Sequence, residues 1–329
     1  MMPRFHSHRG RTVRTQKILV LAGAMVATML LAGVAARAVS AGPLITVQAP
    51  AWDPSQYDGV TLASDAPDVT TLPTVHAVYV YPSDASSRFL KFAAMFQRDA
   101  RRASTMLDTS VARAIRWDER NGAAARYLDV TVVKSKYTAK RLASNQQFSL
   151  VTNDLSARGL TNPNKKYVVW LDAPSSYCGQ SDAPTDSVRS PANRAEARTV
   201  SVIYRYYQYD VNGPNGGFCA PILHELAHGM GAVQPSAPHY TGGHCNDNGN
   251  DLLCLFNSAI PYDPNLGGYY YDYGNDDYWD PAADPTSGST AKLRWWTVNL
   301  SRFICPPKLN PETSTLQADC NTANSNPGY

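Results

Sequence analysis

The histidines and the glutamate between residues 224 and 244 have the types and the spacing that metal-assisted hydrolysis requires. His224 and His228 lie four residues apart in the stretch HELAH, and Pro221 suits the first turn of a helix. Side chains four apart on a helix share one face, so the two imidazoles can converge on one ion while Glu225 points at a water bound to it. We interpret His224 and His228 as zinc ligands and Glu225 as the general base.

A third zinc ligand is expected from His239 or His244. Together with the two helix residues they make up four of the five histidines outside residues 1–41. The fifth, His76, is interpreted as a structural residue of a strand. Gly231 follows His228 by three residues, a spacing at which glycine lets the chain turn off the helix and return towards the metal.

All six cysteines lie beyond residue 41, at positions 178, 219, 245, 254, 305 and 320. They form no close CxxC pairs of the kind found in structural zinc sites, so disulfide bonds are expected in an exported chain. Pairing in sequence order is predicted, which gives Cys178–Cys219, Cys245–Cys254 and Cys305–Cys320. Because His244 adjoins Cys245, the second bond favours His244 as the third ligand, with His239 as the alternative.

The amino terminus has the layout of a signal peptide. Basic residues precede an uncharged run from Ile18 to Ala36, and short residues predict cleavage after Ala41. The alternative is an uncleaved membrane anchor at residues 18–36, and both readings export the chain. Residues 1–41 hold six of the 30 basic residues and none of the 27 acidic ones, so the formal charge changes from +3 to −3 on cleavage. A weakly acidic chain without a basic cluster predicts no nucleic-acid partner and no stable membrane association.

One domain with two flanking segments is predicted for the exported chain. Residues 42–74 are rich in Pro, Asp, Ser and Thr, which is typical of a linker or propeptide-like segment. Residues 75–305 are expected to form the domain, and residues 306–329 a tail tied by a disulfide. Hydrophobic patterns within the domain predict one long helix and several strands of one sheet. The helix runs from Phe89 to about Trp117, and the strands lie at 75–81, near 128–132, at 167–171 and at 200–204.

Several stretches of this sequence carry a family resemblance. HELAHGMGAVQ, APHYTGGHC and NDLLC are similar to the metzincin clan of zinc endopeptidases, especially its exported bacterial members with a GAVQ, HC and DxMC arrangement. GNDDYW at 274–279 and WWTVNLSRF at 295–303 resemble the end of those proteins, so the resemblance covers about residues 75–305. It implies an α+β fold, with a twisted, mostly parallel sheet over an active-site zinc helix, long helices and a small carboxy-terminal subdomain.

Three positions depart from the pattern of that clan. Gln234 stands where the third histidine is usual, and glutamine is a poor zinc ligand. Leu253 matches the methionine of the turn beneath the metal, whose apolar volume leucine can fill. Leu255 matches a tyrosine, so stabilisation of the oxyanion would come from the zinc or from another donor.

The predicted function is hydrolysis of internal peptide bonds in extracellular proteins or peptides. A zinc-activated water would attack the carbonyl, with Glu225 as the general base, in an enzyme expected to be a monomer. The alternative is a non-catalytic exported protein that binds zinc or a surface partner, a degenerate metallopeptidase. The residues at 234, 253 and 255 favour this alternative, whereas the retained Glu225 argues against it.

An acidic group towards the carboxy terminus is a candidate for calcium binding, because Ca²⁺ prefers oxygen ligands. The group has no recognisable loop spacing, so a solvated acidic loop is the alternative. Its members are Asp263, Asp272, Asp276, Asp277 and Asp280.

Overall fold

The computed structural model describes residues 57, 62–111, 113–121, 126–175, 177–186, 192–204, 222–255, 260, 270–280, 298 and 301–305. All of them belong to the larger of two compact units, Pro50–Tyr329. The predicted signal segment and the tail at 306–329 fall outside these residues and stay predictions. Among the described helices, none is long and apolar enough to cross a lipid bilayer.

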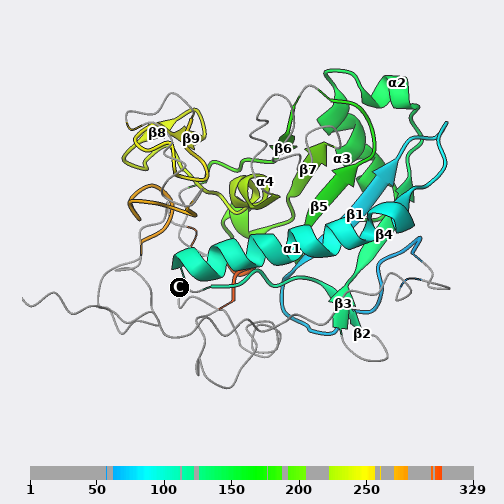
Figure 1. Ribbon diagram of the computed structural model, residues 1–329, viewed down its shortest axis with the longest axis horizontal. Coiled ribbons are helices and arrows are strands. Elements are labelled where there is room, and N and C mark those ends of the chain that lie inside the picture. Colours follow the sequence, from blue (N-terminus) through cyan, green and yellow to red (C-terminus); the bar gives the residue numbers. More distant parts are fainter. Residues whose placement is uncertain are drawn as a thin grey trace, which may run out of the picture. The chain divides into compact units, whose positions relative to one another are not determined.

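A five-stranded sheet lies at the centre of this unit (Figure 1). Four strands are parallel, and β6 runs antiparallel at one edge. The parallel strands are rich in valine and aromatic residues that are buried on both faces, as expected where helices cover a sheet on each side. In order across the sheet, the strands are β4 (Val130–Lys134), β1 (Thr74–Tyr81), β5 (Lys165–Leu171), β7 (Val200–Tyr204) and β6 (Gly179–Ser181).

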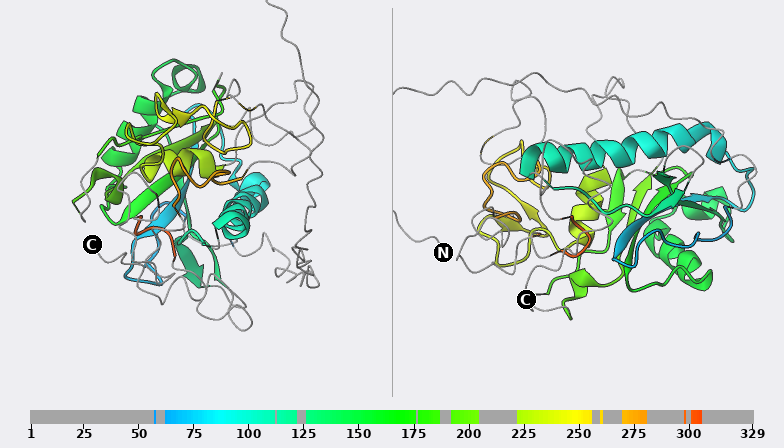
Figure 2. Two further views of the ribbon diagram at one scale, coloured as in Figure 1. Left: turned by 90° about the vertical axis from the view of Figure 1, so that its left-hand side faces the viewer. Right: turned by 90° about the horizontal axis from the view of Figure 1, so that it is seen from below.

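Two helices cover one face of the sheet (Figure 2). They are α1 (Phe89–Val111) and α4 (Ile222–Gly229). Phe96 of α1 and Leu226 of α4 share one buried cluster with Trp170 of β5. The helix that carries the HELAH stretch is therefore buried between the sheet and the long helix.

The opposite face of the sheet is covered by α2 (Ala139–Leu142) and α3 (Gln147–Ala157). Val151 of α3 packs there with Val78 of β1 and Val202 of β7. Neighbouring residues of a strand point to opposite faces, which is why one strand can contribute to both layers of core. The three layers confirm the expected mixed architecture of helices around a twisted, mostly parallel sheet.

The boundaries of two elements in the structure differ from those predicted. The long helix stops at Val111 rather than near Trp117, because residues 115 to 117 are extended and form bridges with Ile304 and Val75. The strand expected near 128–132 is interrupted at Asp129, whose carboxylate bonds to Arg120 and accepts the Ala66 N–H. At this residue the chain passes from the antiparallel pair with β2 to the parallel sheet beside β1.

Short elements complete the described chain. Two of them, β2 (Glu119–Asn121) and β3 (Arg126–Leu128), form an antiparallel pair that lies between α1 and β4 in the chain. A second antiparallel pair, β8 (Tyr240–Thr241) and β9 (His244–Cys245), follows α4. The sequence did not predict α2, α3 or the edge strand β6. The elements α2 and β6 are too short to show a hydrophobic period, and two of the buried positions of α3, Gln147 and Asp154, are polar.

The compact unit begins before the predicted start at Val75. The Tyr57 ring is buried in the main cluster, and its hydroxyl donates to the Leu128 carbonyl at 2.8 Å. Leu62 packs against the same cluster, and its carbonyl accepts the Val132 N–H at 2.6 Å. Part of the segment expected to be a linker therefore contributes to the core.

A buried ion cluster holds residues 65 to 68 against the sheet. Lys165 Nζ lies 2.6 Å from Asp118 Oδ2, 2.6 Å from Asp65 Oδ2 and 2.5 Å from Asp68 Oδ1. His76 Nδ1 lies 2.8 Å from the same Asp118 oxygen, which agrees with its interpretation as a structural residue. Burial by itself would raise the pKa of Asp118, but the His76 hydrogen bond and the Lys165 charge outweigh it and lower that pKa. The stabilisation is present above the unfolded pKa of about 4 and is lost as the pH falls through the folded pKa.

We expect Asp118→Asn to lower the free energy of unfolding by about 3–5 kcal/mol at pH 7, because it removes one partner of a buried ion pair. Asp68→Asn is the matched control, since both carboxylates pair with Lys165 but their side chains are 1% and 34% exposed. The control should lose about 1 kcal/mol or less. Urea unfolding of both variants measures the difference, and equal losses would show that burial does not set the strength of these pairs.

Candidate metal centre

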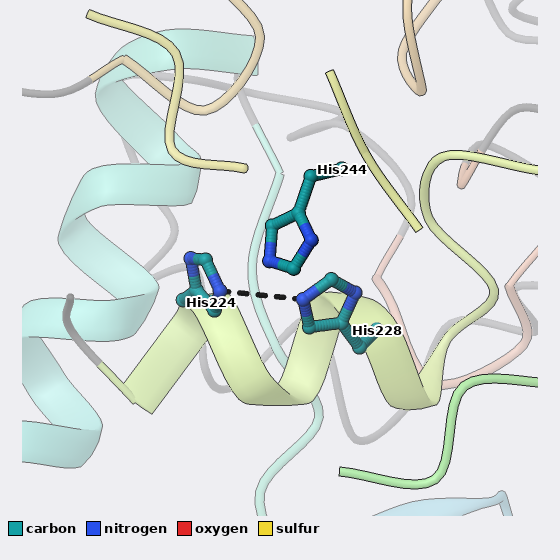
Figure 3. Close-up of side chains that lie close together, drawn as sticks. All are labelled: His224, His228 and His244. Atoms are coloured by element: carbon teal, nitrogen blue, oxygen red, sulfur yellow. Dashed lines mark hydrogen bonds between the residues drawn. The ribbon is translucent and has the colours of Figure 1, made fainter. Parts of the chain in front are cut away.

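Helix α4 presents the three residues of the HELAH stretch that were predicted to do chemistry. Leu223 and Leu226 are buried against the sheet, which turns the face with His224 and His228 away from it. The two rings lie side by side, with Nε2 atoms 3.2 Å apart and ring centroids 4.8 Å apart (Figure 3). The four-residue spacing thus brings both imidazoles to one point, as predicted.

His244 of β9 completes a group of three histidines above α4 (Figure 3). Its ring centroid lies 5.5 Å from that of His224 and 4.8 Å from that of His228. One ring nitrogen of each histidine lies within 4.8 Å of one from each of the others. Of the two candidates for a third ligand, His244 is therefore the one that lies beside the helix pair.

The Nε2 atoms of His224 and His228 have the spacing of two ligands of a tetrahedral zinc ion. Zn–N bonds of about 2.0–2.1 Å at tetrahedral angles put two ligand nitrogens about 3.3–3.4 Å apart, close to the 3.2 Å between His224 and His228. His224 Nδ1 lies 2.7 Å from the Leu252 carbonyl, so this nitrogen donates its proton and Nε2 keeps a free lone pair. His228 Nδ1 is buried and has no hydrogen-bond partner among the described residues.

The surroundings of the three histidines keep them neutral, which is the form that binds a metal. Burial lowers the pKa of His224 to about 4, against the opposing effect of the hydrogen bond that His224 donates to the Leu252 carbonyl. Burial also lowers the pKa of His228, and the two neighbouring imidazoles lower it further. The pKa of His244 is lowered by burial as well. A cation would therefore not have to displace protons from these rings near neutral pH.

Glu225 lies between α4 and the edge strand β6. A Cβ atom built on Gly179 of β6 would come within 2.5 Å of the Glu225 Oε1 atom, so only glycine leaves room for this carboxylate. Burial raises the pKa of Glu225 to about 8. The sequence alone did not single out Gly179, because its closeness to Glu225 arises only from the pairing of β6 with β7.

The carboxy-terminal end of α4 is held by residues from other elements. The buried Lys166 Nζ donates to the carbonyls of Gly229 at 2.8 Å and Ala195 at 2.7 Å. Gly231 has a φ of 83°, the left-handed conformation that favours glycine after a helix. The chain thus turns at the glycine that was predicted to let it leave the helix.

Gln234 lies outside the histidine group and fastens a neighbouring loop. Its side-chain Nε2 donates to the Pro184 carbonyl and to the Gly231 carbonyl, both at 2.8 Å, and its Oε1 accepts the Asp186 N–H at 2.9 Å. All polar atoms of this amide are therefore used in backbone contacts. The residue that departs from the expected pattern has a structural role here.

A disulfide between Cys245 and Cys254 closes the loop that follows His244, which confirms this predicted pair. The Cys245 N–H donates to the Leu253 carbonyl, and the buried Leu253 side chain belongs to the main core. The same loop carries the Leu252 carbonyl that orients His224. Cys178 and Cys305 are also disulfide-bonded, but their predicted partners Cys219 and Cys320 lie outside the described residues.

His239 belongs to a separate, acidic group. Its Nδ1 lies 3.1 Å from Asp277 Oδ1 and 3.7 Å from Asp276 Oδ2, and its side chain is 36% exposed. Asp247 and Asp251, which were not among the acidic residues singled out by sequence, lie near Asp277. Burial raises the pKa of Asp251 to about 9 and that of Asp277 to about 7.

The predicted acidic group is only partly brought together. Asp272 uses its carboxylate to accept backbone N–H groups of residues 276 to 279, so it organises its own loop. Asp263 lies outside the described residues. Asp280 is buried and lies outside the described groups of side chains that could share one ion.

No family model matches the chain, and no curated protein matches it. Similar solved structures include an archaemetzincin from Methanopyrus kandleri, with 13% identity and a TM-score of 0.29 over 56% of this chain and 83% of that one. OgpA from Akkermansia muciniphila has 13% identity and a TM-score of 0.31 over 51% of each chain. A catalytically inactive OgpA, in complex with an O-glycopeptide substrate, has 12% identity and a TM-score of 0.30 over 52% of each.

We expect replacement of both Cys245 and Cys254 by serine to lower the free energy of unfolding by about 3 kcal/mol or less. The bond spans nine residues, and opening so short a loop restores a limited amount of chain entropy to the unfolded state. Urea unfolding of the variant and the parent measures the loss. An unchanged free energy would mean that the loop carrying His244 is ordered without the disulfide.

Proposed function

We propose that this protein is an exported zinc-dependent endopeptidase. His224, His228 and His244 would hold the zinc ion, and Glu225 would act as the general base. The observation that carries the proposal is the convergence of three neutral imidazoles at the helix that also carries Glu225, which is partly shielded from water. A site that only held zinc for stability would have no need of that glutamate.

Zinc bound by three histidines polarises a carbonyl group and lowers the pKa of a water towards about 7. Glu225 would take a proton from the attacking water and then deliver it to the leaving amine. Burial that raises the pKa of this carboxyl towards neutral supports both transfers, because a general base works best with a pKa near the working pH. Leu252 would keep the His224 ring in place through its carbonyl during the reaction.

The edge strand β6 supports a peptide as the substrate. It is the last strand in the order β4-β1-β5-β7-β6, and within the described chain its outer edge pairs with no other strand. Extended peptides bind such edges by adding a strand through backbone hydrogen bonds. Since Gly179 of β6 lies against Glu225, a peptide on this edge would pass the general base.

The predicted signal segment supports action outside the cell, on proteins or peptides found there. Its alternative, an anchor at residues 18–36, would keep the same domain on the outer face of the membrane. We propose that the enzyme acts as a monomer, because all three histidines and Glu225 come from one chain.

Glu225→Gln should retain zinc and lose at least about a hundredfold in kcat/KM for peptide hydrolysis, since a positioned general base contributes about 10²- to 10⁴-fold. Zinc content is measured by elemental analysis, and activity with a quenched fluorescent peptide library. Glu119→Gln, in the separate pair of strands β2 and β3, is the matched control and should keep full activity. A parent that binds zinc and cleaves no peptide would instead support the non-catalytic alternative.

His244→Ala should release zinc at chelator concentrations that the parent tolerates, whereas His239→Ala should retain it. The reason is that His244 adjoins His224 and His228, while His239 contacts Asp277. Competition with a chromophoric chelator measures the zinc affinity of each variant. Loss of zinc from His239→Ala alone would transfer the ligand role to that residue.

A further inference from the structure

Three carboxylates meet at a place next to, but distinct from, the histidine centre. Asp247 and Asp251 come from the disulfide loop, and Asp277 comes from the segment 270–280. One carboxylate oxygen of each lies within 4.8 Å of one from each of the others. We refer to these three residues as the carboxylate cluster. Cys245 and Cys254 lie beside it, but they are bonded to each other and offer no thiolate.

Two members of the carboxylate cluster are fully buried, and each has an oxygen without a hydrogen-bond partner in the part of the chain that the structure describes. Asp251 Oδ1 accepts the Tyr273 N–H and the Tyr278 hydroxyl, both at 3.0 Å, whereas its Oδ2 has no hydrogen-bond partner among the described residues. Asp277 Oδ1 accepts the His239 N–H at 3.1 Å, and its buried Oδ2 has no partner within the same residues. Both side chains are 0% exposed. Buried polar atoms in native proteins normally have hydrogen-bond partners, so these two oxygens indicate that a ligand binds here.

The described residues offer little positive charge to balance the carboxylate cluster. Within them, the basic side chain in ion-pair reach of Asp247 and Asp277 is His239, at 3.9 Å and 3.1 Å, and it is partly exposed. Three carboxylates in one poorly solvated place repel one another strongly. A divalent cation removes this cost by binding the oxygens directly.

We propose that the carboxylate cluster binds a calcium ion. Ca²⁺ takes oxygen ligands at about 2.3–2.6 Å, so two ligands of one ion lie at most about 5.2 Å apart, and the oxygens of the carboxylate cluster all lie within 4.8 Å of one another. The available donors are carboxylate oxygens carried on irregular loops. Such loops suit the adaptable coordination of calcium better than the strict octahedron of magnesium.

The ion would join two segments that are distant in sequence. One is the disulfide loop, which carries His244 at its start and the Leu252 carbonyl next to Asp251. The other is the segment around Asp277, whose Tyr278 hydroxyl already contacts Asp251. Calcium would therefore stabilise the loop that supports the histidine centre, although its binding does not depend on the proposed activity.

Terbium luminescence tests the site on the full, zinc-loaded chain. Tb³⁺ binds oxygen sites that suit calcium and emits when a nearby tyrosine is excited, and Tyr278 is in contact with Asp251. We expect emission that Ca²⁺ abolishes with a dissociation constant on the order of 10⁻⁴–10⁻³ M, as in extracellular modules, and that Mg²⁺ affects at least about tenfold less. Calcium should also raise the Tm of the metal-depleted, zinc-reloaded protein. Emission that Ca²⁺ does not displace, or a Tm that calcium leaves unchanged, would overturn the proposal.

Asp251→Asn and Asp277→Asn should each weaken calcium binding by at least about tenfold, while Asp84→Asn should leave it unchanged. Asp84 is the control because its carboxylate accepts the Ala139 N–H ahead of α2, away from the carboxylate cluster. In calcium-free buffer, Asp251→Asn should be about as stable as the parent, since an amide and a protonated carboxyl are both uncharged. His244→Ala should still bind calcium, which separates this site from the zinc site. Calcium binding of equal strength by Asp251→Asn, Asp277→Asn and the parent would contradict the proposal. If either variant does not fold, the terbium and calcium titration of the parent decides.

Discussion

The packing of α4 against the parallel sheet is the constraint on which the candidate metal centre depends. Leu223 and Leu226 fasten one side of this short helix to the core, and Lys166 bonds to its last carbonyl. The same burial keeps His224 and His228 neutral and shields Glu225 from water. A freely solvated helix with the same residues would let the rings rotate and ionise, so the chemistry of the stretch depends on its place in the fold.

The loop after α4 supplies the third histidine and a hydrogen-bond acceptor for His224. It returns His244 to the two helix histidines, and the Leu252 carbonyl selects which nitrogen of His224 stays free. The Cys245–Cys254 bond closes this loop, and the carboxylate cluster lies beside it. One covalent bond and one proposed ion would therefore order a segment that has little regular structure of its own.

Two of the three departures from the resembled family, Gln234 and Leu253, have local physical explanations. The side-chain amide of Gln234 makes three hydrogen bonds to the backbone of two loops. A histidine could not make the same three bonds, because its two ring nitrogens do not match the donors and the acceptor of an amide. Leu253 fills an apolar place in the core. Neither departure affects His224, His228 or His244. Both are therefore compatible with a metal centre whose third ligand comes from further along the chain.

The sequence by itself determined the local features of this protein. The four-residue spacing of His224 and His228, the turn at Gly231 and the buried runs of β1, β5 and β7 follow from short-range periodicity and backbone preference. Tertiary structure placed His244, and not His239, beside His224 and His228, ended α1 before Trp117 and placed Gly179 against Glu225. It also brought Asp247 and Asp251 to Asp277. These outcomes depend on contacts between residues far apart in the chain, which a local pattern cannot encode.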